Sequence, residues 1–397
     1  MGKRVLLIQL ARLGDLVQTI PVITAFKEAH GDWTVDLLCP AQLEKIGRMI
    51  PGIAAVVPWD GAAWNQRARV AEREFHPDAL VEADAAFRAI ANDPYDCAFV
   101  LNQHPRAILA GALLARESIG AIVGGPLDQT LSPWATYVRA IASDRRENRI
   151  HLADAFCGMC GTSPPKRMRP MRVPVASLPD ELNQIGQSEG CWTGLLVGAG
   201  EEDRLVPITV WACLIIACLN TLPRSRLVLF GSKQEQERAH AIQSLLPSSL
   251  LGRVWDTTGR LSLTELAQGL TRCQVVIGAD TGPLHLAAAL GINVIGWYFA
   301  RARVHETGPY GLHHWVWQAE GEGESDSVSR SLCPKTWPID ETIAILANKP
   351  VPVPPNWSVW ESHRDTWGAY YVPAGQEPTV PRQRESIWRE LHPTPVG

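Results

Sequence analysis

The sequence predicts an α/β protein with two doubly wound domains that face each other across a cleft. Short apolar runs alternate with longer helical patterns along the chain, as they do in βαβ units with parallel sheets. The alternation breaks off after Val123 and resumes at Gly194, which indicates two similar halves. A length of 397 residues agrees with two domains and a further segment.

The first half, residues 1–175, is predicted to contain five strands separated by helices. The predicted strands are residues 5–10, 34–38, 54–57, 97–101 and 118–123. The helical patterns lie near residues 18–30, 41–50, 66–91 and 105–116. A looser stretch, residues 126–179, follows without an assigned element.

The second half, residues 190–335, repeats this organisation. Its predicted strands are residues 194–197, 226–230, 274–278 and 293–297, with a weaker one at 314–318. The helical patterns lie near residues 208–221, 234–246, 262–271 and 283–290. Ligands of such sheets bind beyond the carboxyl ends of the strands, so the cleft between the halves is the expected site.

The last segment, residues 336–397, begins with a predicted helix at 338–348 and then becomes rich in Pro and Trp. Four prolines between residues 350 and 355 exclude a helix there. Large aromatic side chains such as Trp357, Trp360 and Trp367 are costly to leave in water. We therefore expect this extension to pack back on the body.

Composition excludes several classes of protein. Hydrophobic residues make up 46% and charged residues 20%, which is ordinary for a globular chain. The net charge of −4 gives no basic surplus for nucleic acid. No apolar run reaches the roughly 18 residues of a membrane-spanning helix, and the first ten residues do not read as a signal peptide. We expect a cytoplasmic protein with at most peripheral membrane contact.

The first motif, Arg12-Leu13-Gly14-Asp15, directly follows the first predicted strand. Asp15 is at the carboxyl end of a strand and near the start of a helix. It is interpreted either as a helix cap, which accepts free backbone N–H groups, or as a general base at the mouth of the cleft. The dinucleotide fingerprint G-x-G-x-x-G is missing at this turn.

The second motif covers residues 278–289, where a strand ends, Asp280-Thr281-Gly282-Pro283 forms a turn and an Ala-rich helix begins. The free N–H groups of that helix favour a phosphate. Thr281 offers a hydroxyl, and His285 lies one turn into the helix. The alternative is structural, with Thr281 as the cap and His285 as a packed histidine.

Two further turns carry weaker signals for phosphate binding. Small residues at 198–200 follow the first strand of the second half and precede Arg204, whose charge could neutralise a pyrophosphate. Residues 231–233 end the next strand in the same way. Small residues after strands are also common turn formers, and no P-loop sequence follows.

Metal and hydrolase signatures are missing from the sequence. Cys157 and Cys160 form the single C-x-x-C, without the second pair that a structural zinc site needs, and we interpret them as ordinary thiols. The motifs H-E-x-x-H and G-x-S-x-G do not occur. We expect no metal and no cofactor.

These motifs resemble those of glycosyltransferase family 9, the lipopolysaccharide heptosyltransferases. Residues 5–21, VLLIQLARLGDLVQTIP, are similar to the opening strand, loop and helix of that family. Residues 257–296, TTGRLSLTELAQGLTRCQVVIGADTGPLHLAAALGINVIG, resemble its second signature. Tyr95-Asp96, residues 230–233 and 308–311, and Cys333 before the helix from Pro338 also fit. The resemblance covers about residues 3–348.

The resemblance implies a GT-B architecture and an inverting, metal-independent sugar transfer from a nucleotide-sugar, usually ADP-heptose. It carries the role of catalytic base onto Asp15, and the family's basic residue, usually Lys, onto Arg204. The predicted donor site is Gly198, Ala199, Gly200, Arg204, Gly231, Ser232, Lys233, Asp280, Thr281, Gly282, Pro283 and His285, and the predicted acceptor side is Arg12 and Gly14. Some members have a carboxylate after the Gly of the second C-terminal strand, where this chain has Lys233.

The acceptor stays open: lipopolysaccharide core, another glycan or a protein. Two other functions also fit the architecture. A nucleotide-sugar epimerase would turn over its sugar without an acceptor. A non-catalytic binding or assembly protein would use the cleft and the Trp-rich extension, and loss of Asp15 would then leave its activity unchanged.

Overall fold

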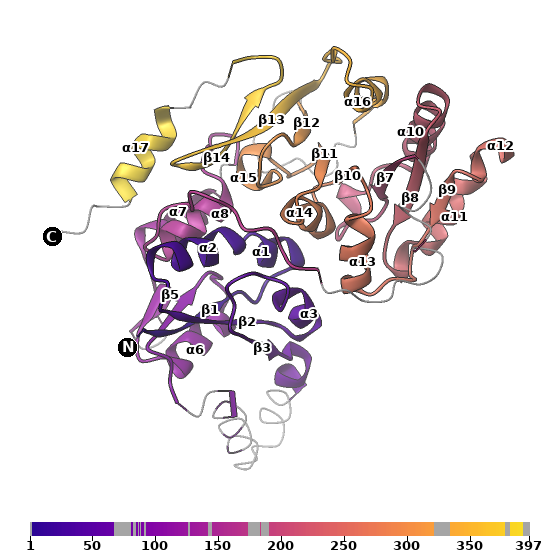
Figure 1. The fold of residues 1–397 in the computed structure, drawn as a ribbon. Coiled ribbons are helices and arrows are strands. Elements are labelled where there is room, and N and C mark those ends of the chain that lie inside the picture. The colour runs from indigo at the N-terminus through magenta and orange to yellow at the C-terminus, as the bar shows by residue number, and fades with distance from the viewer. Residues whose placement is uncertain are drawn as a thin grey trace.

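The computed structural model shows two α/β halves stacked on each other, with the C-terminal extension bridging them (Figure 1). It describes residues 2–66, 81, 85, 87, 89–90, 93–125, 128–141, 145–173, 183, 190–320, 334–377 and 382–391. Most of the predicted helix at 66–91, most of the boundary between 175 and 190, and Cys333 lie outside these residues.

The first half is a six-stranded sheet with the order β3-β2-β1-β4-β5-β6. The first five strands pair in parallel, and β6 pairs with β5 in the antiparallel direction. The strands are β1 (Arg4–Ile8), β2 (Thr34–Pro40), β3 (Ala55–Trp59), β4 (Cys97–Val100), β5 (Ser118–Gly125) and β6 (Asp128–Leu131). The helices are α1 (Leu13–Val17), α2 (Ile20–Ala29), α3 (Glu44–Gly47), α6 (Pro105–Leu114), α7 (Pro133–Ile141) and α8 (Leu152–Met159), with η1 (Ala41–Leu43) before α3.

The second half is an eight-stranded sheet with the order β14-β13-β12-β11-β10-β7-β8-β9, parallel from β9 to β12. Its strands are β7 (Cys191–Leu196), β8 (Ser225–Phe230), β9 (Val254–Asp256), β10 (Val275–Ala279), β11 (Asn293–Tyr298), β12 (Trp315–Ala319), β13 (Trp357–Asp365) and β14 (Gly368–Pro373). Its helices are η2 (Glu202–Arg204), α10 (Ile208–Thr221), η3 (Lys233–Glu235), α11 (Gln236–Ser244), α12 (Ser248–Leu251), α13 (Leu263–Leu270), α14 (Gly282–Ala289), α15 (Val304–Thr307) and α16 (Ile339–Leu346), followed by α17 (Arg382–Leu391) of the extension.

The predicted fold class is confirmed, and several short elements were not predicted. The stretch at 126–179, left without an element, contains β6, α7 and α8. The helix predicted at 18–30 is α2, and the short helix α1 before it was not predicted. The three-residue strand β9 was also missed.

The extension adds a β-hairpin to the second sheet and then reaches the first half. β13 pairs with β12, and β14 with β13, both in the antiparallel direction. The turn of the hairpin meets α8, where the Ala369 N–H donates to Asp154 Oδ2 at 2.8 Å. In α17, Trp388 packs on Trp134 of α7 with ring centroids 4.4 Å apart. The extension therefore contacts both halves, and Figure 1 shows α17 beside α7 and α8.

In the part of the chain that the structure describes, one helical stretch, Glu202–Thr221, is long and apolar enough to cross a membrane by length and composition alone. Helices in the core of globular proteins pass the same test. Its main part, α10, buries Trp211, Leu214 and Ile215 in the core of the second half.

Candidate functional site

A cavity of about 970 Å³ lies between the halves, at the carboxyl ends of both sheets. The turns that line it follow β1, β7, β8 and β10, and three of these strands, β1, β7 and β10, lie where the strand order of a sheet reverses. The predicted site residues that line the cavity are Arg12, Gly14, Asp15, Gly198, Ala199, Gly200, Arg204, Gly231, Ser232, Asp280, Thr281, Gly282, Pro283 and His285. Lys233, which was also predicted for the donor site, does not line the cavity.

Asp15 is in the first turn of α1 and faces the cavity. Its Oδ2 accepts the backbone N–H of Arg12 at 3.3 Å, so the carboxylate does cap this helix. Burial raises the pKa of Asp15, the N–H of Arg12 and nearby His285 lower it, and Asp280 raises it, with a net increase. A carboxylate with a raised pKa is a better proton acceptor. Capping and general-base chemistry are therefore compatible at this position.

Gly14 of α1 and Gly282 of α14 lie where the two halves touch, and both line the cavity. A methyl group on Gly14 would come within 3.0 Å of His285 Cδ2, and one on Gly282 within 2.8 Å of Leu13 Cβ. Gly14 was predicted to lie on the acceptor side of the cleft. In the structure the space beside it holds His285, so the two glycines allow α1 and α14 to approach across the cleft.

We expect Gly282→Ala to push the halves apart. The new methyl group has Leu13 Cβ and the Gly14 nitrogen within 3.1 Å, which are backbone-anchored atoms that cannot swing away. Overpacking of this kind costs about 1–2 kcal/mol of stability, and the rate of sugar transfer should fall with it. Thermal denaturation checks the first effect. Gly252→Ala is the control, because a methyl group there meets nothing within 4 Å. Equal melting temperatures for the two variants would contradict the close contact.

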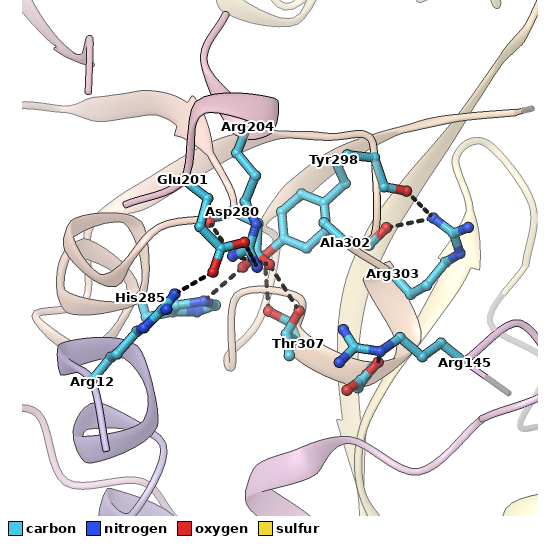
Figure 2. A network of polar contacts seen from close by, with 12 residues as sticks. Arg12, Arg145, Glu201, Arg204, Asp280, His285, Tyr298, Ala302, Arg303 and Thr307 are labelled. Atoms are coloured by element: carbon cyan, nitrogen blue, oxygen red, sulfur yellow. Dashed lines mark hydrogen bonds and ion pairs between the residues drawn. The ribbon is translucent and has the colours of Figure 1, made fainter. Parts of the chain in front are cut away.

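Asp280 is the centre of the polar network in Figure 2. Its Oδ1 is 3.0 Å from His285 Nε2, and its Oδ2 accepts from Thr307 Oγ1 at 3.4 Å and lies 3.7 Å from Arg204 Nη1. Burial alone would raise the pKa of Asp280, but the His285 hydrogen bond and the charge of Arg204 outweigh it and lower the pKa. Asp280 is therefore a fixed anion that orients Arg204 and His285.

Arg204 is connected to the first half through Glu201. Glu201 accepts from Arg204 Nη2 at 3.2 Å and from Arg12 Nη1 at 2.7 Å, so it lies between the two guanidinium groups (Figure 2). The Arg12 hydrogen bond and the nearby Arg204 lower the pKa of Glu201. These ion pairs connect the two halves across the cleft and hold the guanidinium groups of Arg12 and Arg204 close to the Glu201 carboxylate.

Thr281 is the residue before α14, yet its side chain does not cap the helix. Its Oγ1 is buried and has no hydrogen-bond partner among the described residues. The hydroxyl, the first N–H groups of α14 and the side chain of Arg204 thus border the same part of the cavity. Such an arrangement suits a phosphate group.

The end of the cavity away from Arg145 and Glu306 is apolar. Phe230, Leu261, Leu263 and Leu266 line it, together with the turn after β8. Glu235 also reaches this wall, and its Oε2 accepts the Ser232 N–H at 2.6 Å. A flat apolar group with polar substituents, such as a nucleoside, fits these surroundings.

Cys157 and Cys160 lie in the core and away from the cavity. Burial raises the pKa of both thiols well above the ordinary value, as in structural cysteines. Within the described ranges, no three His, Cys, Asp or Glu side chains cluster closely enough to hold a metal ion.

Comparison with known proteins assigns the chain to a family. The model of glycosyltransferase family 9 (heptosyltransferase) matches residues 87–336. The chain belongs to glycosyltransferase family 9. Lipopolysaccharide heptosyltransferase 1 of Salmonella typhimurium strain LT2 is 24% identical over 304 residues, which are 72% of this chain and 85% of that protein.

Solved structures agree with the family in fold. A family 9 glycosyltransferase from Veillonella parvula DSM 2008 superposes with a TM-score of 0.63 at 17% identity, over 88% of this chain and 97% of that one. The ADP-heptose lipopolysaccharide heptosyltransferase II of E. coli gives 0.59 at 16% identity, over 87% and 98%. The chain is therefore a glycosyltransferase with the GT-B architecture of two facing Rossmann-like domains.

Sequence reasoning missed three charged residues of this glycosyltransferase's cavity, Glu235, Arg145 and Glu306, and the ion pairs of Glu201 beside it. Glu235 supplies a carboxylate beside the turn after β8, where we had found Lys233 instead. The position of Glu235 in the sequence, four residues after Gly231, could have indicated that its carboxylate reaches the cavity. Arg145 and Glu306 come from loops far apart in the sequence, and neither is part of a motif.

Proposed function

We propose that this chain transfers a heptose from ADP-heptose to an acceptor hydroxyl, with inversion at the anomeric carbon and without a metal ion. One observation carries the proposal. Asp15 of the first half and Arg204, Asp280 and Thr281 of the second half line a single cavity. The named activity of the E. coli relative, an ADP-heptose lipopolysaccharide heptosyltransferase, supports the choice of donor.

In this proposal the second half holds the donor. The diphosphate takes hydrogen bonds from Arg204, the Thr281 hydroxyl and the N-terminus of α14, which is a set of donors suited to its charge. Phosphate oxygens then compete with Glu201 for Arg204. The adenosine occupies the apolar end near Phe230 and Leu266, and Glu235 accepts from ribose hydroxyls.

The first half supplies the base. Asp15 takes the proton of the acceptor hydroxyl while that oxygen attacks the anomeric carbon, and the bond from this carbon to the diphosphate oxygen breaks on the opposite face. Inversion follows from this in-line geometry. Arg204 and the helix N-terminus stabilise the charge that develops on the departing ADP. The acceptor is a glycan, a lipopolysaccharide core or a protein, and the Salmonella relative's name favours lipopolysaccharide.

A nucleotide screen by thermal shift tests the donor. A ligand that binds only the folded protein raises its melting temperature, and at equal concentration the tighter ligand raises it more. We expect ADP and ADP-heptose to raise the melting temperature more than UDP-, GDP- or CDP-linked sugars at equal concentration. A larger shift with another nucleotide would contradict the choice of ADP-heptose.

A further inference from the structure

Glu306 is a buried carboxylate in the wall of the cavity for which neither the motifs nor the proposed transfer has a role. Glu306 lies in the short helix α15, and 7% of its surface is exposed. Its Oε2 has no hydrogen bond among the described residues and is 3.5 Å from Arg145 Nε, a long ion pair. Burial raises the pKa of Glu306 to about 7, although Arg145 lowers it. A buried carboxyl oxygen with so little compensation is costly unless a ligand supplies a donor.

The helix that carries Glu306 is held rigidly. The Val304 N–H donates to Gln318 Oε1 at 3.0 Å, and Tyr298 Oη donates to the Thr307 carbonyl at 2.8 Å. The carbonyl of Gly308, the next residue, is 2.8 Å from Nε2 of the buried His151 in the first half. Groups positioned this firmly lose little entropy when they bind a ligand.

The place of Glu306 in the cavity indicates which part of the donor it meets. Its neighbour Thr307 bonds to Asp280, which is in contact with Arg204, so Glu306 is next to the proposed phosphate site. Figure 2 shows Arg145, its partner, on the other side of Thr307 from Arg12 and His285. The apolar end of the cavity with Phe230, where the nucleoside is proposed to bind, lies away from Glu306. A sugar joined to the second phosphate falls between the phosphate site and Glu306.

We propose that Glu306 accepts a hydrogen bond from a hydroxyl group of the transferred sugar and so contributes to donor selectivity. This assignment rests on the proposed donor site. Arg145 from the first half holds the carboxylate in place, so the sugar is recognised only when both halves are together. The sugar hydroxyl satisfies the oxygen that the protein leaves without a hydrogen bond.

The test compares the binding of ADP with that of ADP-heptose by calorimetry in wild type and Glu306→Gln. The variant keeps the size of the side chain and loses the charge. We expect ADP to bind within about twofold of wild type and ADP-heptose to bind about tenfold more weakly, the value of one hydrogen bond to a charged group. Glu237→Gln, on the exposed face of α11, is the matched control and should change neither affinity.

A role only in joining the halves gives a different result. Glu306→Gln and Arg145→Ala would then both lower the melting temperature. Either variant would weaken the binding of ADP and of ADP-heptose by the same factor, or would leave both affinities unchanged. This absence of a selective effect on ADP-heptose overturns the assignment. If Glu306→Gln does not fold, Glu306→Asp keeps the charge but shortens its reach and should show the same selective loss.

If wild type binds neither ligand, the proposed donor site fails and this assignment fails with it. If wild type and Glu306→Gln bind both ligands alike, only the assignment fails.

Discussion

We expect Asp15→Asn to lower the turnover of sugar transfer by about 10²–10⁴-fold, the usual contribution of a general base. Asn has the shape of Asp and still accepts the Arg12 N–H, which lies 3.3 Å from Asp15 Oδ2. It cannot take a proton. Donor affinity should stay close to wild type, because the donor is bound by the second half.

The stability of the same variant separates the base from a mere cap. The pKa of Asp15 is raised in the folded protein, so the folded state binds the proton more tightly than the unfolded state. The stability gained in this way is present below the unfolded pKa and is lost as the pH rises through the folded pKa. At neutral pH the charged Asp15 therefore lowers stability, and Asn removes that cost.

We therefore expect Asp15→Asn to melt at the wild-type temperature or above it while its turnover collapses. For wild type, kcat/KM should fall as the pH drops through the raised pKa, since only the ionised carboxylate accepts a proton. Asp32→Asn, on an exposed turn of the same half, is the control. Near wild-type turnover in Asp15→Asn would remove this residue from the mechanism and favour the epimerase or binding functions.

Arg204→Ala should weaken the binding of ADP by about 1.5–3 kcal/mol, the range for a hydrogen bond to a charged group. Arg204 Nη1 is 3.4 Å from the Asp280 carbonyl, next to the start of α14, and Asp280 and Glu201 fix its position. Its side chain is 24% exposed, so solvent screens it only partly. Arg204→Lys should recover part of the loss, because Lys keeps the charge but not the planar fork.

Isothermal titration with ADP measures this effect directly. Arg272→Ala, an exposed arginine of the same half that does not line the cavity, should bind ADP as wild type does. Unaltered ADP binding in Arg204→Ala would place the phosphates elsewhere. The melting temperature of Arg204→Ala also matters, because removing this cation leaves Asp280 buried beside His285 with less compensation.

The parallel strands and the turns after them were predictable from the sequence because each is a local pattern. A buried strand is a short apolar run, and the residue after it is at the carboxyl edge of the sheet, where Asp15, Arg204 and Asp280 are found. Which of these turns meet in space follows from the strand order, since β1, β7 and β10 lie at the switch points.

The parts that were not predictable depend on contacts between distant residues. The hairpin β13–β14 pairs with the edge of β12, a strand about 40 residues earlier, and no local pattern in its own residues indicates that partner. Glu306 is buried by an arginine 161 positions earlier, through an ion pair that no motif marks. The tight approach of Gly14 to His285 likewise exists only after the two halves have come together.

The central claim is transfer of a sugar from ADP-heptose by groups of both halves, and acceptor-dependent release of ADP tests it most directly. Purified protein is incubated with ADP-heptose in the presence of EDTA, with and without a heptose-free lipopolysaccharide acceptor, and ADP is measured over time. The proposed mechanism predicts ADP release only when the acceptor is present, no inhibition by the chelator, and loss of release in Asp15→Asn. Consumption of ADP-heptose at the same rate without acceptor, or by Asp15→Asn at the wild-type rate, would contradict it.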